Sequence, residues 1–389
     1  MNFQFLSPQK LSDARNLYPH TKNGSIYLNH ASTGPFSTRV VEALTSYLQN
    51  RSSGIVETYR TDVRAVTACK NAIQTLVHAE SSERIAFISN TSEGINIIAS
   101  GLPWKSGGRV VLNDSEFPAN VYPYYRLKKY GVELDILKSI DGKITPSMIE
   151  QVLTPKTRVV ALSAVQFLSG YRADLEAIGK ICRSRGIWFV VDGIQAAGAI
   201  KIDVQKMCID AFAAGGQKWL MAPHGIGFLY LTESMQNVID QQHLGWLSVS
   251  DPWQFFNYEQ PLSPSARRYE GGSLNIPGVI GMHPALETLL EFEPEAIESH
   301  ILAITKILMN ELQTIDGLRL ISPEADGERA GIVSVRKQDG DFPLSFSDSL
   351  EQRGMTCSVR NGTLRFSPHF YNTPDEMKSA AAIVSELLY

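Results

Sequence analysis

A lysine and an aspartate near the middle of the chain each follow an apolar run that is typical of a buried strand. Asp192 closes the run 187–192, in which five apolar residues precede the carboxylate. Lys218 follows the short apolar run 210–214 and precedes another at 225–231. Unbroken runs of this kind favour strands covered on both faces, as in mostly parallel sheets. Because ligands of open α/β sheets bind beyond the carboxyl ends of the strands, the two side chains could face one cavity.

A lysine and an aspartate that face one cavity would suit a specific chemistry. In a low-dielectric cleft a lysine loses its proton more easily and can form a Schiff base. Pyridoxal phosphate (PLP) requires such a lysine, together with an aspartate that keeps its pyridine nitrogen protonated. The protonated ring then accepts the electrons of a carbanion at the substrate Cα. The competing interpretation is a charge at a strand end and an unrelated surface lysine, and the two residues alone do not decide between them.

The residues around this pair resemble those of a known family. The spacing from Asp192 through Gln195 to Lys218, with the strand at 225–231 behind it, resembles the central motif of the class V aminotransferases. That family is a branch of the fold type I PLP enzymes and includes cysteine desulfurases, isopenicillin N epimerase and kynureninase. The resemblance extends over about residues 20–375, with the motifs in the family order. It implies that Lys218 carries PLP, that Asp192 holds the pyridine nitrogen, and that Gln195 bonds the phenolic oxygen of the cofactor.

A second motif suggests how the phosphate of PLP is held. Asn90-Thr91-Ser92-Glu93-Gly94 follows a predicted strand at 84–89 and opens a helix. The first amides of a helix lack partners and lie at the positive end of its dipole, which suits a phosphate. The plain alternative is an N-cap with a turn like a capping box. The motif resembles the phosphate-binding turn of the family, which implies Thr91 and Ser92 as phosphate ligands.

Two positions next to the lysine depart from the family pattern. Gly215 stands where the family has Ser or Thr, and Gln217 where it has His. The side-chain amide of Gln217 can still donate a hydrogen bond to phosphate, whereas Gly215 offers only its backbone. Weaker phosphate binding, or binding by other groups, is therefore an open question.

Two further residues are candidates for contacts with the cofactor ring. Phe117 follows the predicted strand 108–113 and occupies the family position of the aromatic or His that stacks on the pyridine. It would serve equally as an ordinary core aromatic. Gln166 follows the strand 158–164 at the family position of an Asn or Gln near the phenolic oxygen. The alternative for Gln166 is that it only satisfies loop backbone.

Three residues are candidates for contacts with the substrate or with a second subunit. Arg365 lies in a segment resembling the final motif of the family, in which the arginine binds the substrate α-carboxylate. A guanidinium suits this role because it offers two parallel donors. His30 lies in a turn-rich loop that lines the substrate site in the family, although a lone loop histidine is often structural. Ser273 occupies the place of a hydroxyl that reaches the phosphate bound by the neighbouring subunit, which implies a homodimer with shared active sites.

The order of predicted elements gives the fold class. Seven strands near 85–89, 109–113, 132–137, 158–164, 187–192, 210–214 and 227–231 alternate mostly with helices. This alternation predicts an α/β domain with a doubly wound, seven-stranded, mostly parallel sheet. The family resemblance implies that this domain is the large domain of the PLP-dependent transferase fold type I. A long helix at 277–314, broken at Glu293-Pro294, precedes short strands and a helix that predict a small α+β domain. We expect a large PLP-binding domain at 20–288 and a small domain formed by 1–19 and 289–389.

Composition excludes several other classes of protein. The 389 residues include 43% hydrophobic and 20% charged ones, and the net charge of −4 gives no reason to expect nucleic acid or an anionic membrane as partner. The four cysteines are scattered without CxxC spacing, so we expect reduced thiols and no metal site. The N-terminus does not resemble a signal peptide, and no apolar run approaches the length of a membrane span. These features favour a cytoplasmic enzyme.

The reaction type is less constrained than the cofactor. Aminotransfer of class V type is the first expectation, acting on the Cα of an amino acid through the lysine Schiff base. The alternatives are epimerisation as in isopenicillin N epimerase, and C–S or C–Se cleavage as in cysteine desulfurases and selenocysteine lyases. Desulfurases that resemble this chain carry a nucleophilic cysteine in a loop before the arginine of the final motif. In this chain only four residues separate Arg360 from Arg365, and none of them is a cysteine. Cys357 lies in a predicted strand. A PLP-binding sensor without catalysis, and an NAD-binding protein lacking GxGxxG after its first strand, are remoter alternatives.

Overall fold

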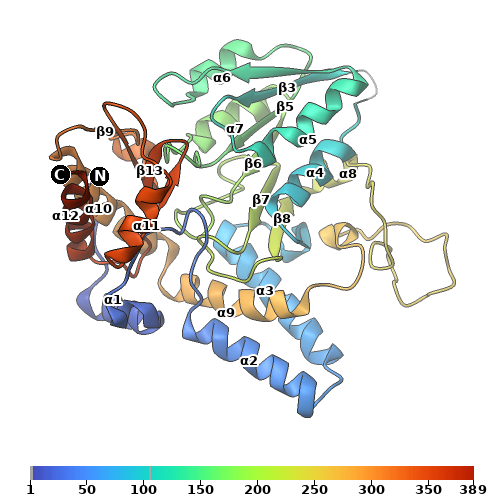
Figure 1. The fold of residues 1–389 in the computed structure, drawn as a ribbon. Helices are drawn as coiled ribbons and strands as arrows, with labels where there is room; N and C mark the ends of the chain where they lie inside the picture. The colour runs from blue at the N-terminus through green and yellow to red at the C-terminus, as the bar shows by residue number, and fades with distance from the viewer. Residues whose placement is uncertain (1–2, 105–106) are drawn as a thin grey trace.

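A seven-stranded sheet forms the centre of the larger part of the molecule (Figure 1). The structure is a computed structural model and describes residues 3–104 and 107–389. In spatial order the strands are β2 (Ile85–Ile88), β8 (Gly227–Leu231), β7 (Ala211–Gly215), β6 (Trp188–Asp192), β5 (Thr157–Ser163), β3 (Gly108–Asn113) and β4 (Val132–Leu137). β8 runs antiparallel to both of its neighbours, and the remaining pairs are parallel. The seven strands and the mostly parallel sheet that the sequence predicts are therefore confirmed.

Helices cover both faces of this sheet, which explains the unbroken apolar runs of its strands. Phe189 and Val191 of β6 belong to the apolar cluster on one face, and Val190 belongs to the cluster on the other. This alternation follows from the two-residue period of a strand. The first face packs against α2 (Thr38–Ser53), α3 (Tyr59–Val77), α6 (Pro146–Val152), α7 (Leu175–Ser184) and α9 (Ile276–Glu291). The other face packs against α4 (Thr91–Gly101), α5 (Tyr122–Tyr125) and α8 (Glu233–Val238).

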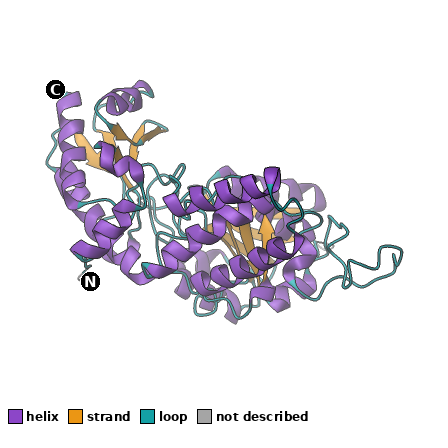
Figure 2. Cartoon of the chain, turned by 90° about the horizontal axis from the view of Figure 1, so that it is seen from below, coloured by secondary structure: helices purple, strands orange, loops and turns teal. Residues whose placement is uncertain are grey.

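A smaller α+β part lies beside the large sheet and contains both ends of the chain (Figure 2). Its antiparallel sheet has the order β12 (Ser358–Arg360), β13 (Thr363–Phe366), β10 (Val333–Lys337) and β9 (Leu318–Leu320). The sheet packs with α10 (Pro294–Gln313), α11 (Ser345–Gln352) and α12 (Pro374–Leu388) around a third apolar cluster. The predicted break of the long helix at Glu293-Pro294 separates α9 from α10.

The N-terminal arm packs on this smaller part. Its helix α1 (Pro8–Asn16) is joined to α12 by an ion pair of 2.6 Å between Arg15 and Glu376. Further along, β1 (Ile26–Tyr27) pairs in parallel with β11 (Met355–Thr356). We propose the expected division into two domains. We propose in addition that the N-terminal part of the small domain extends to Tyr27 and does not end at residue 19.

The remaining regular structure consists of short 3₁₀ turns. They are η1 (Pro19–Asn23), η2 (Ser82–Arg84), η3 (Pro118–Asn120), η4 (Arg126–Tyr130), η5 (Ala266–Tyr269) and η6 (Asp326–Glu328). Residues 241–270 contain η5 and otherwise form the long loop that projects beyond α8 (yellow in Figure 1). Across residues 3–104 and 107–389, no helix is long and apolar enough to cross a membrane. Within the same ranges, no group of three or more His, Cys, Asp and Glu side chains could hold a metal ion.

Candidate active site

The carboxyl ends of the parallel strands bring the central motif together. Asp192 ends β6, where the register pairs it with Ser163 of β5 and Ala213 of β7. Lys218 lies in the turn between β7 and β8. A loop of the N-terminal arm packs directly on this turn, because the Gly34 amide donates to the Gln217 carbonyl at 2.8 Å. A Cβ at Gly34 would lie 2.3 Å from the Lys218 carbonyl oxygen, so only glycine allows this approach.

One carboxylate oxygen of Asp192 is available to accept a hydrogen bond from a ligand. The side chain is buried, and its Oδ1 accepts a hydrogen bond of 2.9 Å from the Ile194 amide. Its Oδ2 is buried and has no hydrogen-bond partner within the described ranges of the chain. Burial, opposed by the Ile194 amide and assisted by the charge of Glu116, raises the pKa of Asp192. A buried carboxylate with an unused acceptor favours a ligand that brings a charged N–H group.

Lys218 is positioned to be a reactive amine. Burial lowers its pKa to about 8, against the opposing charge of Asp192 and with the help of Arg365 and Arg360. Its Nζ lies 5.8 Å from the centroid of the Phe117 ring. Phe117 remains about half exposed and meets Phe167 edge to face at 5.3 Å between centroids. The structure thus brings Lys218, Asp192 and Phe117 into one cluster, in which Phe117 is accessible to a ligand.

Glu116 is a buried carboxylate that no sequence motif points to. It accepts hydrogen bonds from the side chains of Asn113 and Asn120, from the backbone and hydroxyl of Ser163, and from Gln166 Nε2 at 3.0 Å. This network links the ends of β3 and β5 and fixes the orientation of the Gln166 amide. The Oε1 of Gln166 is left buried without a partner within the described residues, so it could accept from a ligand.

Gln195 is fixed at both ends of its side chain. Its Nε2 donates to the Ala31 carbonyl at 3.0 Å, and its Oε1 accepts from the Trp219 indole at 2.8 Å. These bonds join the N-terminal loop to the turn that carries Lys218. One Nε2 proton stays available for the expected bond to the cofactor.

The expected phosphate end is built from α4 and the turn after β7. Asn90 caps α4, and the Gly215 amide donates to the Thr91 hydroxyl at 3.0 Å, so the two segments touch. The Ser92 hydroxyl has no hydrogen-bond partner in the part of the chain that the structure describes. A Cβ on Gly215 would lie 2.5 Å from Gln217 Oε1, so the Gln217 amide occupies the space that a side chain at 215 would need. The two departures from the family pattern are thus spatially coupled.

Arg365 reaches from the small sheet to the loop that follows β5 of the large sheet. It is buried, and it donates from Nη1 to the Phe167 carbonyl at 2.7 Å and from Nη2 to the Ser32 hydroxyl at 2.8 Å. Its buried Nε has no partner within the described ranges, and no carboxylate there forms an ion pair with it. Burial and the neighbouring charge of Arg360 lower the pKa of Arg365 to about 10. A buried guanidinium with an unused donor is suited to bind a carboxylate that comes from outside the chain.

His30 is engaged by groups of its own chain, and Ser273 lies away from the Lys218 cluster of its own chain. His30 is fully buried, its Nδ1 donates to the Ser367 carbonyl at 2.9 Å, and its Nε2 accepts from the Tyr371 hydroxyl at 3.0 Å. With both nitrogens engaged, His30 supports the loop under the site and has no group free for a substrate; the loop residue that reaches Arg365 is Ser32, which no sequence signal distinguishes. Ser273 is exposed in a pocket lined by Tyr59, Trp246 and Trp253, and no contact joins it to the Lys218 cluster within the described part of this chain.

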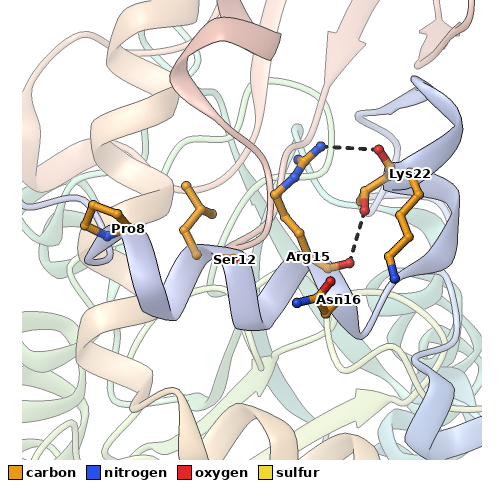
Figure 3. A pocket seen from close by; sticks show the side chains of 7 residues that line it. Pro8, Ser12, Arg15, Asn16 and Lys22 are labelled. Atoms are coloured by element: carbon orange, nitrogen blue, oxygen red, sulfur yellow. Dashed lines mark hydrogen bonds between the residues drawn. The ribbon is translucent and has the colours of Figure 1, made fainter.

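A separate pocket lies on the N-terminal arm and shares no residue with this cluster. It is lined by α1 and η1, including Pro8, Ser12, Asn16 and Lys22 (Figure 3). Arg15 and Thr21 form two hydrogen bonds at its wall, of 3.4 and 3.0 Å. None of the residues of the central motif lines this pocket, so we do not include it in the candidate site.

The cluster fits PLP because several of its polar groups have no hydrogen-bond partner within the described residues and match groups of the cofactor. The free Oδ2 of Asp192 matches a protonated pyridine nitrogen, and the amine of Lys218 matches the cofactor aldehyde. The first turn of α4, the Ser92 hydroxyl and the Gln217 amide match a phosphate. Buried polar atoms without partners are rare in folded chains, and here several face one cluster.

Comparison with known proteins identifies related chains. The family model described as aminotransferase class-V matches residues 26–379. A probable cysteine desulfurase of Methanothermobacter thermautotrophicus is 28% identical over 384 residues, which cover 93% of this chain and 94% of the relative. The apo structure of a cysteine desulfurase from Thermococcus onnurineus NA1 superposes with a TM-score of 0.87 at 24% identity, covering 99% of each chain. A complex of the cystine C–S lyase C-DES with its reaction product cysteine persulfide superposes with a TM-score of 0.83 at 21% identity, covering 93% of this chain and 97% of the other.

Proposed function

We propose, from the premise that this chain belongs to the aminotransferase class-V family, that it is a PLP-dependent enzyme that breaks a carbon–sulfur bond of an amino acid without using a thiol of its own. The sequence favours aminotransfer first and C–S cleavage among the alternatives. The relative from Methanothermobacter thermautotrophicus is named a probable cysteine desulfurase, and this favours the alternative. The observation that carries the more specific proposal is the hairpin that stands where a desulfurase would hold its reactive cysteine.

That hairpin leaves no room for a mobile cysteine. β12 ends at Arg360 and β13 begins at Thr363, so Asn361 and Gly362 alone form the turn. The nearest cysteine, Cys357, is buried, and burial raises the pKa of its thiol well above the ordinary value. Since the thiolate is the nucleophile, a buried neutral thiol cannot accept sulfur from a substrate. The sulfur must then leave with its own substituent.

PLP when bound would withdraw electrons from the substrate Cα, and the cluster around Lys218 would hold it. Asp192 Oδ2 would face the pyridine nitrogen, and the face of Phe117 would lie against the ring. Gln166 and Gln195 would lie near the phenolic oxygen. The groups that would surround the phosphate come from α4 and the turn after β7: Thr91, Ser92 and Gln217. Each of these assignments is a proposal that rests on the groups left free at the cluster.

Arg365 would bind the substrate, and Lys218 would transfer its Cα proton. Arg365 would bind the α-carboxylate through its unused Nε and so fix the rotation of the substrate about Cα. The amine of Lys218, with a pKa lowered to about 8, would take the proton from Cα as general base. The Cβ–S bond then breaks, and both of its electrons leave with sulfur. For cystine the balance is cystine plus water giving pyruvate, ammonia and cysteine persulfide.

A homodimer is the proposed active unit. Ser273 is exposed and lies in a pocket with the large aromatic side chains of Tyr59, Trp246 and Trp253. Trp253 is 53% exposed, and the loop beside it exposes Phe256 to 87%. Aromatic surfaces of this kind favour burial by a partner. A second copy seated there would bring Ser273 toward the phosphate of the neighbouring site, as the family resemblance implies.

Product analysis tests the proposed reaction. The purified, PLP-loaded protein is incubated with L-cystine and, separately, with L-cysteine, and keto acids, ammonia and amino acids are quantified. We expect pyruvate and ammonia in equal amounts, at the same rate in a Cys357→Ala variant. Alanine formed together with a persulfide on the protein, and lost in Cys357→Ala, would instead indicate a desulfurase with an enzyme thiol. Exchange of the amino group with a keto acid would restore aminotransfer as the function, and change of configuration without cleavage would indicate an epimerase.

A further inference from the structure

The β12–β13 hairpin places two arginines on one face of the small sheet. Its register pairs Ser358 with Arg365 and Arg360 with Thr363. Residues that face each other across a ladder point to the same side, and so do residues two apart on a strand. Arg360 and Arg365 are therefore diagonal neighbours on one face. That face is turned to the large domain, because Arg365 donates to the Phe167 carbonyl.

The tight turn is what holds Arg360 at this position. Asn361 and Gly362 have φ of 47° and 70°, both in the left-handed region. Two such residues form a two-residue turn that keeps the strands paired up to its edge, and asparagine followed by glycine is the preferred pair for it. Arg360, the last residue of β12, therefore cannot swing away with a long loop.

Arg360 and Arg365 converge on one hydroxyl. Ser32 Oγ accepts from Arg365 Nη2 at 2.8 Å and from Arg360 Nη2 at 3.4 Å. Within residues 3–104 and 107–389, neither arginine forms an ion pair with a carboxylate. Both guanidinium groups also lower the pKa of Lys218, whereas the opposing charge comes from Asp192. This end of the site thus has an excess of positive charge that one substrate carboxylate would not balance.

The two arginines differ in burial, and this assigns them different tasks. Arg365 is 2% exposed and has a free Nε, so it suits the α-carboxylate next to the reacting Cα. Arg360 is exposed, and it lies at the outer side of Ser32. An exposed arginine is often only solvated, but here two guanidinium groups without a carboxylate partner in the described residues converge on one hydroxyl, and an anion bound beside them would offset their repulsion.

We propose that Arg360 binds a second negative charge on the substrate, carried by the group attached to sulfur. The inference rests on the proposed function and narrows its substrate class to amino acids in which the sulfur substituent ends in a carboxylate or a sulfonate. Arg360 is then a specificity residue, and Arg365 keeps the α-carboxylate.

The test compares two ligands of the same shape and different charge. S-carboxymethylcysteine ends in a carboxylate, and S-carbamoylmethylcysteine replaces it with a neutral amide. Calorimetry on the PLP-loaded Lys218→Ala protein measures their affinities without turnover, and S-sulfocysteine is added to distinguish a sulfonate from a carboxylate. We expect the anionic ligand to bind about tenfold more tightly than the amide, with the ratio falling in high salt because Arg360 is exposed. On the wild-type enzyme, the values of kcat/KM for the same two ligands are measured and their ratio is compared with the ratio of affinities.

Variants then locate the preference. Arg360→Gln should bring the ratio of the two affinities close to one, and Arg360→Lys should retain part of it because charge remains. Arg353→Gln removes an arginine that is paired with Glu386 on the same domain, and should leave the ratio unchanged. Equal affinities in the Lys218→Ala protein, or a ratio that survives when Arg360→Gln is added to it, would overturn the proposal. Failure of the proposed C–S cleavage would show separately, as absence of pyruvate from every ligand while the affinity ratio persists.

Discussion

The two ends of the candidate site are built in different ways. At the cofactor end, Asp192 and Gln166 stand at or just past the ends of neighbouring strands of one sheet. At the substrate end, Arg365 comes from the small sheet, Ser32 from the N-terminal loop and the Phe167 carbonyl from the loop after β5. The first arrangement is set by strand register, and the second depends on how three segments far apart in the sequence dock.

This difference decides what each end tolerates. A group at a strand end is held by the ladder on both sides, so one substitution removes one function and leaves the frame intact. A group held between the two sheets loses its position when any of its supports is lost. Mutations at the cofactor end should therefore weaken PLP binding and the chemical step. Mutations at the substrate end should mainly lower kcat/KM and leave the PLP content normal.

Lys218 should give the largest effect. Borohydride reduction followed by peptide mass spectrometry should find the pyridoxyl group on Lys218. Lys218→Ala should lower kcat by roughly 10³-fold or more, because it removes both the covalent attachment and the general base. Lys201→Ala, a surface lysine paired with Glu295, is the matched control and should retain activity. A label on another lysine, or an active Lys218→Ala enzyme, would show that the cofactor end has been misplaced.

Arg365 should give the next largest effect, and of a different kind. The unused Nε and the second N–H of an Nη group can each donate to a carboxylate, and two charge-assisted hydrogen bonds of this kind are worth about 2–5 kcal/mol when one partner is truncated. At about 1.4 kcal/mol per tenfold, Arg365→Ala should lower kcat/KM by roughly 30-fold to several thousand-fold. Arg365→Lys should recover only part of it, since an ammonium keeps the charge but not the fork.

The control for Arg365 separates substrate binding from folding. PLP content of Arg365→Ala should stay near that of the wild type, because the groups expected to hold the cofactor are untouched. Arg319→Ala, an exposed arginine of β9 in the same small sheet, should leave kcat/KM unchanged. If Arg365→Ala keeps both full PLP content and full kcat/KM, the carboxylate is bound elsewhere, and Arg360 becomes the first candidate.

The rate of PLP uptake should reveal the electrostatics of the cofactor end. Only the neutral amine of Lys218 can attack the aldehyde, and burial lowers its pKa to about 8 from the ordinary 10.5. The rate constant for attachment to the apoprotein should therefore rise about tenfold per pH unit below 8 and level off above it. Stopped-flow absorbance measures this rate. A rate that still rises steeply between about pH 9 and 10 would mean that the amine is not buried as described.

The same contrast accounts for what could be predicted from the sequence. The strands were readable because Phe189, Val190 and Val191 are buried on both faces, and an unbroken apolar run of this length is typical of a strand inside a sheet. Asp192 and Lys218 follow from those strands, since their place in the chain nearly fixes their place in space. Glu116 was missed because its importance comes from donors on β3 and β5 that only the sheet brings together.

Which side chain the loop at the substrate end presents is harder to predict from the sequence, for the same reason. His30 looked like a contact because its loop lies in the right place, but its nitrogens are engaged by Ser367 and Tyr371, which lie 337 and 341 positions away in the sequence. Ser32, two residues further, reaches Arg365 instead. Nothing local distinguishes the two, so the sequence could locate the loop but not the side chain that it presents.

The smallest expected effect concerns Gly215 and Gln217. Because a Cβ at Gly215 would lie 2.5 Å from Gln217 Oε1, Gly215→Ser should displace the Gln217 amide and put a hydroxyl in its place. If the Gln217 amide is a phosphate donor, Gln217→Ala alone should weaken PLP binding by about tenfold, the value of one hydrogen bond to a charged group at a half-buried site. In a protein that already carries Gly215→Ser, the same change should cost much less, because the new hydroxyl takes over. Equilibrium titration of the four apoproteins with PLP gives the coupling between the two positions. Strictly additive effects would mean that the two residues do not share a phosphate oxygen, and that the crowding between them is a matter of packing alone.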